Sequence, residues 1–222
     1  MFKLKMPIEF YDKCYSEYLI EKYPVGFFNY GIDIGACGSC HMWHVYNMAL
    51  KHKNALIIGV EPNDKYFKEL ETENKNMNNV VLYKQFYGKD LSLKDIIDEN
   101  NIDISKQFYI SCDCEGDEKY LFSKDNIEYL SKCSHIALEF HETWCGISYD
   151  EFIKKFEDLL KDTHKGFRTY YEKRPNSLFS SMIFIKTDIY NDKNTNIQNI
   201  IEYLKLHPPI NNSKFHNITE LF

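Results

Sequence analysis

The chain has 222 residues, of which 44% are hydrophobic and 27% are charged, and its formal net charge is −6. A chain of this length can bury a large core, and no linker rich in Pro, Gly or Ser divides it, so we expect one domain. No apolar run approaches the roughly 20 residues of a membrane span, and residues 1–10 lack the apolar core of a signal peptide, which argues against a membrane protein.

The acidic balance and the scattered lysines argue weakly against a large contact with nucleic acid. The chain has seven cysteines, an odd number without a secretory signal, which indicates reduced thiols and a cytoplasmic location. The composition gives no indication of the oligomeric state.

Strands and helices alternate along the chain. In chain order, the pattern predicts a helix over 9–23, a strand over 30–34, a helix over 39–52, a strand over 56–60, a helix over 64–75, a strand over 80–83 and a helix over 91–99. A strand over 107–112, a helix over 117–131, a strand over 135–140 and a helix over 149–160 follow. Strands over 167–171 and 178–185 are joined by a turn at Arg174-Pro175-Asn176, and a polar loop with a short helix occupies 191–206.

This order predicts an α/β fold with a seven-stranded, mostly parallel sheet and helices on both faces. The last two strands are expected to form an antiparallel hairpin. We expect residues 1–28 to form an N-terminal helical segment, 29–190 the α/β domain, and 191–222 a loop and short helix that pack on the same domain.

A glycine-containing turn follows the first predicted strand and has the pattern Asp-x-Gly-x-x-Gly. Its glycines allow the backbone to approach a ligand closely, and the N–H groups of the next helix face that ligand. The second strand ends on a glutamate, whose carboxylate can accept two hydrogen bonds from ribose hydroxyls. The pattern predicts a nucleoside-cofactor site at Asp33, Gly35, Ala36, Gly38, Ser39, Glu61, Pro62 and Asn63, joined by Asp113 from the fourth strand.

The turn lacks the Gly-x-Gly-x-x-Gly pattern of pyrophosphate binders, which disfavours a dinucleotide. S-adenosylmethionine fits better, because it contains adenosine but no phosphate. A tight turn between strand and helix, followed by a chance glutamate, is the structural alternative.

Acids and an imidazole follow the fourth and fifth strands, whose carboxyl ends meet at one edge of the predicted sheet. His141 is the candidate general base because its unperturbed pKa lies near roughly 6.5. Asp113, Glu139 and His141 are also a candidate site for Mg²⁺ or Mn²⁺, which would polarise an acceptor hydroxyl. In the alternative interpretation, Asp113 and Glu115 cap the following helix and Glu139 hydrogen-bonds a loop.

Residues 29–186 resemble FkbM-type methyltransferases in three blocks: Ile32-Asp33-Ile34-Gly35-Ala36-Cys37-Gly38-Ser39, then Val60-Glu61-Pro62-Asn63, then Cys112-Asp113-Cys114-Glu115-Gly116-Asp117-Glu118. The third block is similar to the family's Asp-x-Glu-Gly-x-Glu pattern and is the most specific. The resemblance implies a Rossmann-like class I methyltransferase fold, S-adenosylmethionine as methyl donor, and transfer to a hydroxyl oxygen of a sugar, glycan or similar small acceptor. Cys37 departs from the asparagine common at that position.

Two alternatives from other functional classes stay open. The first is a thioredoxin-like thiol-disulfide oxidoreductase that uses Cys37 and Cys40, because a strand, Cys-Gly-x-Cys and a helix follow one another. The second is a non-catalytic protein that binds the cofactor through Glu61 and the glycine turn.

Overall fold

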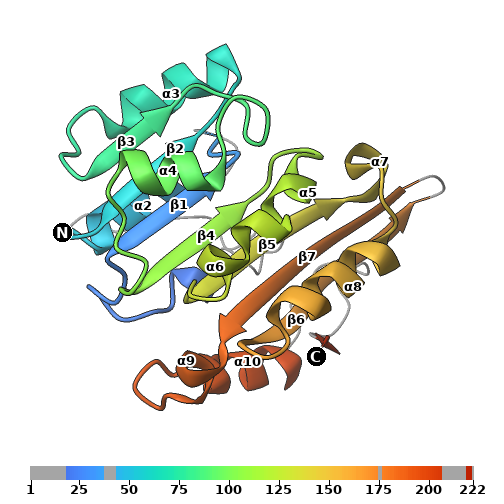
Figure 1. Ribbon diagram of the computed structural model, residues 1–222. Helices are drawn as coiled ribbons and strands as arrows, with labels where there is room; N and C mark the ends of the chain where they lie inside the picture. The colour runs from blue at the N-terminus through green and yellow to red at the C-terminus, as the bar shows by residue number, and fades with distance from the viewer. Residues whose placement is uncertain (1–18, 38–43, 175–176, 207–218, 222) are drawn as a thin grey trace.

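The computed structural model describes residues 19–37, 44–174, 177–206 and 219–221. Within these residues, eight strands form a sheet in the order β3-β2-β1-β4-β5-β7-β6-β8 (Figure 1). Strands β1 to β5 pair in parallel, whereas β7, β6 and β8 each run antiparallel to the preceding strand in that order. The strands are β1 (Tyr30–Ile34), β2 (Leu56–Val60), β3 (Val80–Tyr83), β4 (Phe108–Cys112), β5 (His135–His141), β6 (His164–Arg174), β7 (Ser177–Lys186) and β8 (Thr219–Glu220).

Helices connect these strands. In the described ranges they are α2 (His44–Lys51), α3 (Asp64–Asn74), α4 (Leu93–Glu99), α5 (Glu118–Leu121), α6 (Ile127–Leu130), α7 (Glu142–Cys145), α8 (Tyr149–Leu160), α9 (Thr187–Asn191) and α10 (Ile197–Leu206), with a 3-10 turn η2 at Lys124–Asn126. None of these helices is both long and apolar enough to cross a membrane.

Hydrophobic cores lie on both faces of the sheet, because successive side chains of a buried strand point to opposite sides. Ile58 and Ile110 belong to one core, with side chains from α4, α6 and α8. Their chain neighbours Ile57 and Tyr109 belong to the other, with side chains from α2, α3 and α10. The fold is therefore a three-layer sandwich, and its parallel half directs the carboxyl ends of β1, β2, β4 and β5 to one edge (Figure 1).

The predicted α/β fold is confirmed, and the seven predicted strands are present with the antiparallel hairpin formed by β6 and β7. The structure adds to these seven a strand of two residues, β8, which pairs with β6. A strand of two residues is too short to show a recognisable alternation of polar and apolar side chains.

The predicted helix over 117–131 is broken into α5, η2 and α6. The Asn126 side-chain amide donates to the carbonyl oxygens of Tyr120 and Leu121, which takes the last carbonyls of α5 away from a continuing helix. At the N-terminus, Leu19 and Ile20 are helical but the chain turns before Tyr23. Residues 9–18 and 39–43 of two predicted helices lie outside the described residues.

The proposed boundaries at residues 28 and 190 stay a prediction. Leu19 and Ile20 pack in the same core as Ile197 and Ile201, so side chains from both terminal segments contribute to one face of the domain.

Candidate cofactor and acceptor site

The turn after β1 depends on glycine. Gly35 has φ of +85°, and a Cβ atom there would lie 1.7 Å from the carbonyl oxygen of Asp113. The N–H groups of Gly35 and Ala36 donate to the carbonyl of Val60, at 2.9 and 3.0 Å, and the N–H of Asp113 donates to the carbonyl of Ile34, at 2.9 Å. These bonds hold the ends of β1, β2 and β4 together.

A pocket of about 590 Å³ opens above these three strand ends. Its walls combine aromatic rings with carboxylates. They include Ile34, Gly35, Cys37, Val60, Glu61, Pro62, Asn63, Tyr66, Phe86, Tyr87, Asp113, Cys114, Glu115 and Asp117.

Glu61 is held at the pocket by the backbone that follows it. The side chain is 5% exposed, and its Oε1 accepts a hydrogen bond from the N–H of Asn63 at 2.7 Å. The Asn63 side chain in turn accepts from the N–H groups of Lys65 and Tyr66, which caps α3. The start of α3 therefore fixes the direction of the carboxylate.

The predicted cofactor residues fall into three groups. Gly35, Glu61, Pro62, Asn63 and Asp113 line the pocket. Asp33 and Ala36 are buried and are not part of its lining. Gly38 and Ser39 lie outside the described residues.

Three aromatic lining residues, Tyr66, Phe86 and Tyr87, are absent from the predicted site. The chain contains 17 Tyr and 16 Phe, and residue type does not separate a ring in a pocket from a ring in the core. Only the fold places the loop after β3, which carries Phe86 and Tyr87, beside Tyr66 on α3.

The three residues predicted to act on the methyl acceptor lie close together. Asp113, Glu139 and His141 each offer a ligand atom within 4.8 Å of the others. Nε2 of His141 lies 3.9 Å from Oδ1 of Asp113 and 3.7 Å from Oε2 of Glu115. Asp113 and Glu115 also line the pocket, so His141 adjoins it.

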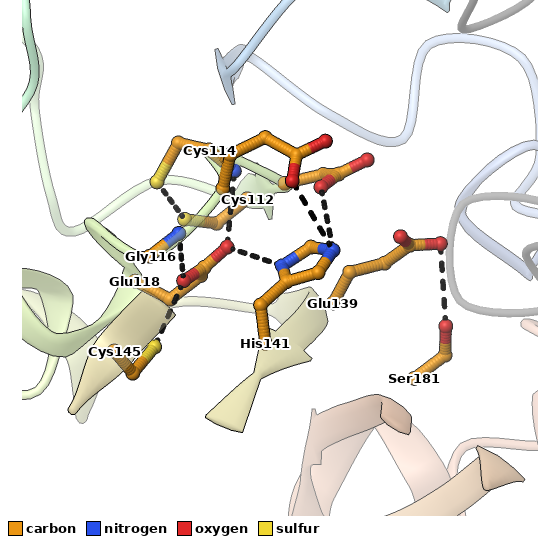
Figure 2. A network of polar contacts seen from close by, with 10 residues as sticks. Cys112, Cys114, Gly116, Glu118, Glu139, His141, Cys145 and Ser181 are labelled. Carbon is orange, nitrogen blue, oxygen red and sulfur yellow. Dashed lines mark hydrogen bonds and ion pairs between the residues drawn. The ribbon is translucent and has the colours of Figure 1, made fainter. Parts of the chain in front are cut away.

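Glu139 contacts a neighbouring strand of the sheet. Its Oε1 accepts from the hydroxyl of Ser181 on the neighbouring strand β7, at 3.4 Å (Figure 2). The N-cap position of α5 is Asp117, whose side chain makes no cap bond, rather than Asp113 or Glu115.

Glu118 lies beneath the imidazole and has no exposed side-chain surface. Its Oε1 is 2.9 Å from Nδ1 of His141 (Figure 2). Burial by itself would lower the pKa of His141, but the Glu118 hydrogen bond and the charges of Glu118, Asp113 and Glu115 raise it above its usual value. The sequence places Glu118 in the third resemblance block but does not reveal this contact.

An exposed tryptophan borders the same imidazole. The ring of Trp144 in α7 stacks on His141, with centroids 5.0 Å apart and planes 25° from parallel. Its side chain is 57% exposed, so it offers a flat apolar surface beside His141. Helix α7 was not predicted, because four residues contain barely one helical turn.

The cysteines near the pocket differ in oxidation state. Cys37 is disulfide-bonded, which departs from the expected reduced thiols. Cysteine count alone does not show which sulfurs the fold brings together. Cys112 and Cys114 are free, with sulfurs 3.6 Å apart, and burial raises the pKa of Cys112 to about 11.

No family model and no curated protein matches the chain. Among solved structures, precorrin-6y C5,15-methyltransferase of Geobacter metallireducens is 14% identical over 76% of this chain and 87% of that chain, with a TM-score of 0.46. The methyltransferase domain of METTL16 is 14% identical over 77% and 64%, with a TM-score of 0.49. The fibrillarin pre-rRNA processing protein of Methanococcus jannaschii is 11% identical over 73% and 68%, with a TM-score of 0.44.

Likenesses this remote say nothing about activity, and the FkbM-type resemblance is supported by its three sequence blocks alone. The fold is assigned from the strand order. A parallel half in the order β3-β2-β1-β4-β5, followed by the antiparallel pair β7 and β6, is a Rossmann-like arrangement of the class I methyltransferase type.

Proposed function

We propose that the chain is an S-adenosylmethionine-dependent methyltransferase that acts on a hydroxyl oxygen of a sugar, glycan or similar small acceptor. The observation that supports this most is a shared wall: Asp113 and Glu115 line the pocket and also face the imidazole of His141. Cofactor and acceptor would therefore meet above the carboxyl ends of the strands, where open α/β sheets bind ligands. The three sequence blocks support the FkbM-type subfamily.

The chemistry of the pocket fits this cofactor. Its volume of about 590 Å³ is usual for a small-molecule site, and Glu61 would accept hydrogen bonds from the ribose hydroxyls. Tyr66, Phe86 and Tyr87 offer apolar surface for a purine. The described lining contains four carboxylates and no Lys or Arg, so a sulfonium cation is attracted there and a pyrophosphate is repelled.

The residues around His141 would prepare the acceptor. S-adenosylmethionine supplies an electrophilic methyl group, and the protein's task is to align the acceptor oxygen with it at about 3–3.5 Å. The methyl–oxygen bond forms as the methyl–sulfur bond breaks, and sulfur keeps the electron pair. His141, when neutral, takes the hydroxyl proton at a ring nitrogen.

The charge around His141 favours a neutral acceptor over a nucleic acid. Asp113, Glu115 and Glu118 lie within 4 Å of the imidazole, and the Glu115 side chain is 64% exposed at the mouth. A phosphate backbone would meet this negative charge directly. The exposed face of Trp144 suits the apolar face of a sugar ring.

The deciding experiment uses S-adenosylmethionine with a labelled methyl group. The protein is incubated with fractionated glycans, lipids, RNA and small hydroxylated molecules, and the labelled fraction identifies the acceptor class. We expect label in a hydroxylated neutral fraction. Label in RNA would refute the acceptor class, and cofactor binding without any labelled product would favour the non-catalytic alternative.

Cofactor binding is tested separately by thermal unfolding with S-adenosylhomocysteine. At a hundredfold excess over Kd, binding adds about 2.7 kcal/mol of stability. For a chain of this size that raises Tm by about 5–10 °C. Glu61→Ala should remove the shift, whereas Glu71→Ala, an exposed acid on α3, should keep it. An unchanged shift in Glu61→Ala would exclude this cofactor position.

A divalent cation is a second candidate component, favoured by the approach of Asp113, Glu139 and His141 within 4.8 Å. Mg²⁺ or Mn²⁺ there would polarise the acceptor hydroxyl in place of a general base. Isothermal titration with each metal alone should then detect one site that is lost in Glu139→Gln. EDTA should abolish methyl transfer if the metal is needed, and unchanged turnover would assign deprotonation to His141 alone.

A further inference from the structure

Glu118 receives hydrogen-bond donors from several directions. Its Oε1 accepts from the N–H of Cys114 at 3.2 Å and faces Nδ1 of His141 at 2.9 Å. Its Oε2 accepts from the N–H of Gly116 at 2.8 Å and from the thiol of Cys145 at 3.1 Å. Burial raises the pKa of Cys145, so this sulfur stays a thiol and can donate. Figure 2 shows the carboxylate at the centre of these contacts.

The backbone around Gly116 makes this arrangement specific. Gly116 has φ of +112°, and a Cβ atom there would lie 2.7 Å from Cβ of Trp144. Glycine therefore lets the loop pack against α7 while its N–H points to Glu118. The same carboxylate holds the loop after β4 and the side chain at the end of β5.

Backbone N–H groups can only donate, so they require acceptor lone pairs on both carboxylate oxygens. A carboxylate that acts as an acceptor selects the imidazole form with hydrogen on the facing nitrogen. This pairing favours the form of His141 that carries hydrogen on Nδ1, the nitrogen that faces Glu118. The other nitrogen, Nε2, points toward Asp113 and Glu115 at the pocket wall.

We propose that Glu118 is a positioning residue that holds neutral His141 as the Nδ1–H tautomer, with the Nε2 lone pair directed at the acceptor position. This role deepens and rests on the proposed methyl transfer. In general, a carboxylate that orients an imidazole in this way fixes both its tautomer and its ring plane. Nε2 is then the atom that takes the acceptor proton.

The test reads the tautomer directly, without acceptor or cofactor. Two-bond ¹H–¹⁵N correlation spectra are recorded on uniformly ¹⁵N-labelled protein at increasing pH, until the His141 signals stop shifting and the imidazole is neutral. The His141 signals are assigned by their loss in His141→Asn. We expect a pyrrole-type Nδ1 and a pyridine-type Nε2. The opposite tautomer in the wild-type protein would overturn the proposal, even if no variant folded.

Glu118→Gln should abolish the preference for the Nδ1–H form, because its amide can place a donor against Nδ1. Cys145→Ala is the matched control: it removes a different donor to Glu118 and should keep the wild-type tautomer. A wild-type pattern in folded Glu118→Gln would contradict the proposal. The affinity for S-adenosylhomocysteine should change less than about threefold, since Glu118 is not in the pocket lining.

With the labelled acceptor in hand, Glu118→Gln should lower kcat about 10- to 100-fold at nearly unchanged KM for the methyl donor. An unchanged kcat would show that the tautomer has no role in turnover. If wild-type protein fails to bind S-adenosylhomocysteine but shows the Nδ1–H tautomer, the proposed function fails while the pairing of Glu118 with His141 stands.

Discussion

Three buried histidines should make the protein sensitive to mild acid. His52, His135 and His164 are at most 1% exposed. Burial is the main cause that lowers their pKa, which is about 4 for His52, about 3 for His135 and about 4 for His164. In the unfolded chain each pKa returns to about 6.5. The unfolded state therefore binds protons first as the pH falls, and folding stability decreases between about pH 6.5 and pH 3.

The size of the loss follows from the pKa differences. At about pH 5, each histidine lowers the free energy of unfolding by about 2 kcal/mol relative to neutral pH. The three together lower it by about 6 kcal/mol. His141 acts in the opposite direction, because its pKa is raised and its contribution is largest below the unfolded pKa. A net loss of several kcal/mol is a large share of the stability of an ordinary domain.

Urea unfolding at a series of pH values measures this dependence. His52→Asn is the most conservative probe, because Nδ1 of His52 accepts from the N–H of Gly26 at 3.1 Å and an asparagine carbonyl can replace that acceptor without titrating. Between about pH 7.5 and pH 5 the variant should lose about 2 kcal/mol less than wild type. Equal losses in both proteins would refute the assignment of His52 as a buried neutral histidine.

Gly35→Ala should destabilise the fold and abolish binding of S-adenosylhomocysteine in the thermal-shift assay, since its Cβ would lie 1.7 Å from a carbonyl oxygen; a stable, binding variant would refute the close contact. Cys37→Ser/Cys40→Ser should keep cofactor binding and activity, whereas insulin reduction by wild type that this variant loses would revive the redox alternative. His141→Ala should lower turnover about 10²- to 10⁴-fold with cofactor affinity nearly unchanged. Mass spectrometry and NMR should locate the methyl group on oxygen in the product, and a methyl on nitrogen or carbon would exclude O-transfer.

The parallel strands could be predicted because buried parallel strands are short apolar runs with clear boundaries. Gly35, Glu61 and Asp113 could be placed together because each follows such a strand. The contact of Glu118 with His141 spans two separate elements and has no local pattern. The same holds for Phe86, whose loop reaches the pocket only through the fold.

The segment 113–118 borders two sites at once, which limits how the protein can be redesigned. Asp113 and Glu115 form one pocket wall, and Glu118 supports the imidazole behind them. A substitution at Asp113 or Glu115 is expected to alter donor and acceptor affinity together. Helix α7 presents Trp144 beside His141 and is not part of the pocket lining. A library confined to that helix is therefore the better starting point for changing acceptor preference while donor affinity stays constant.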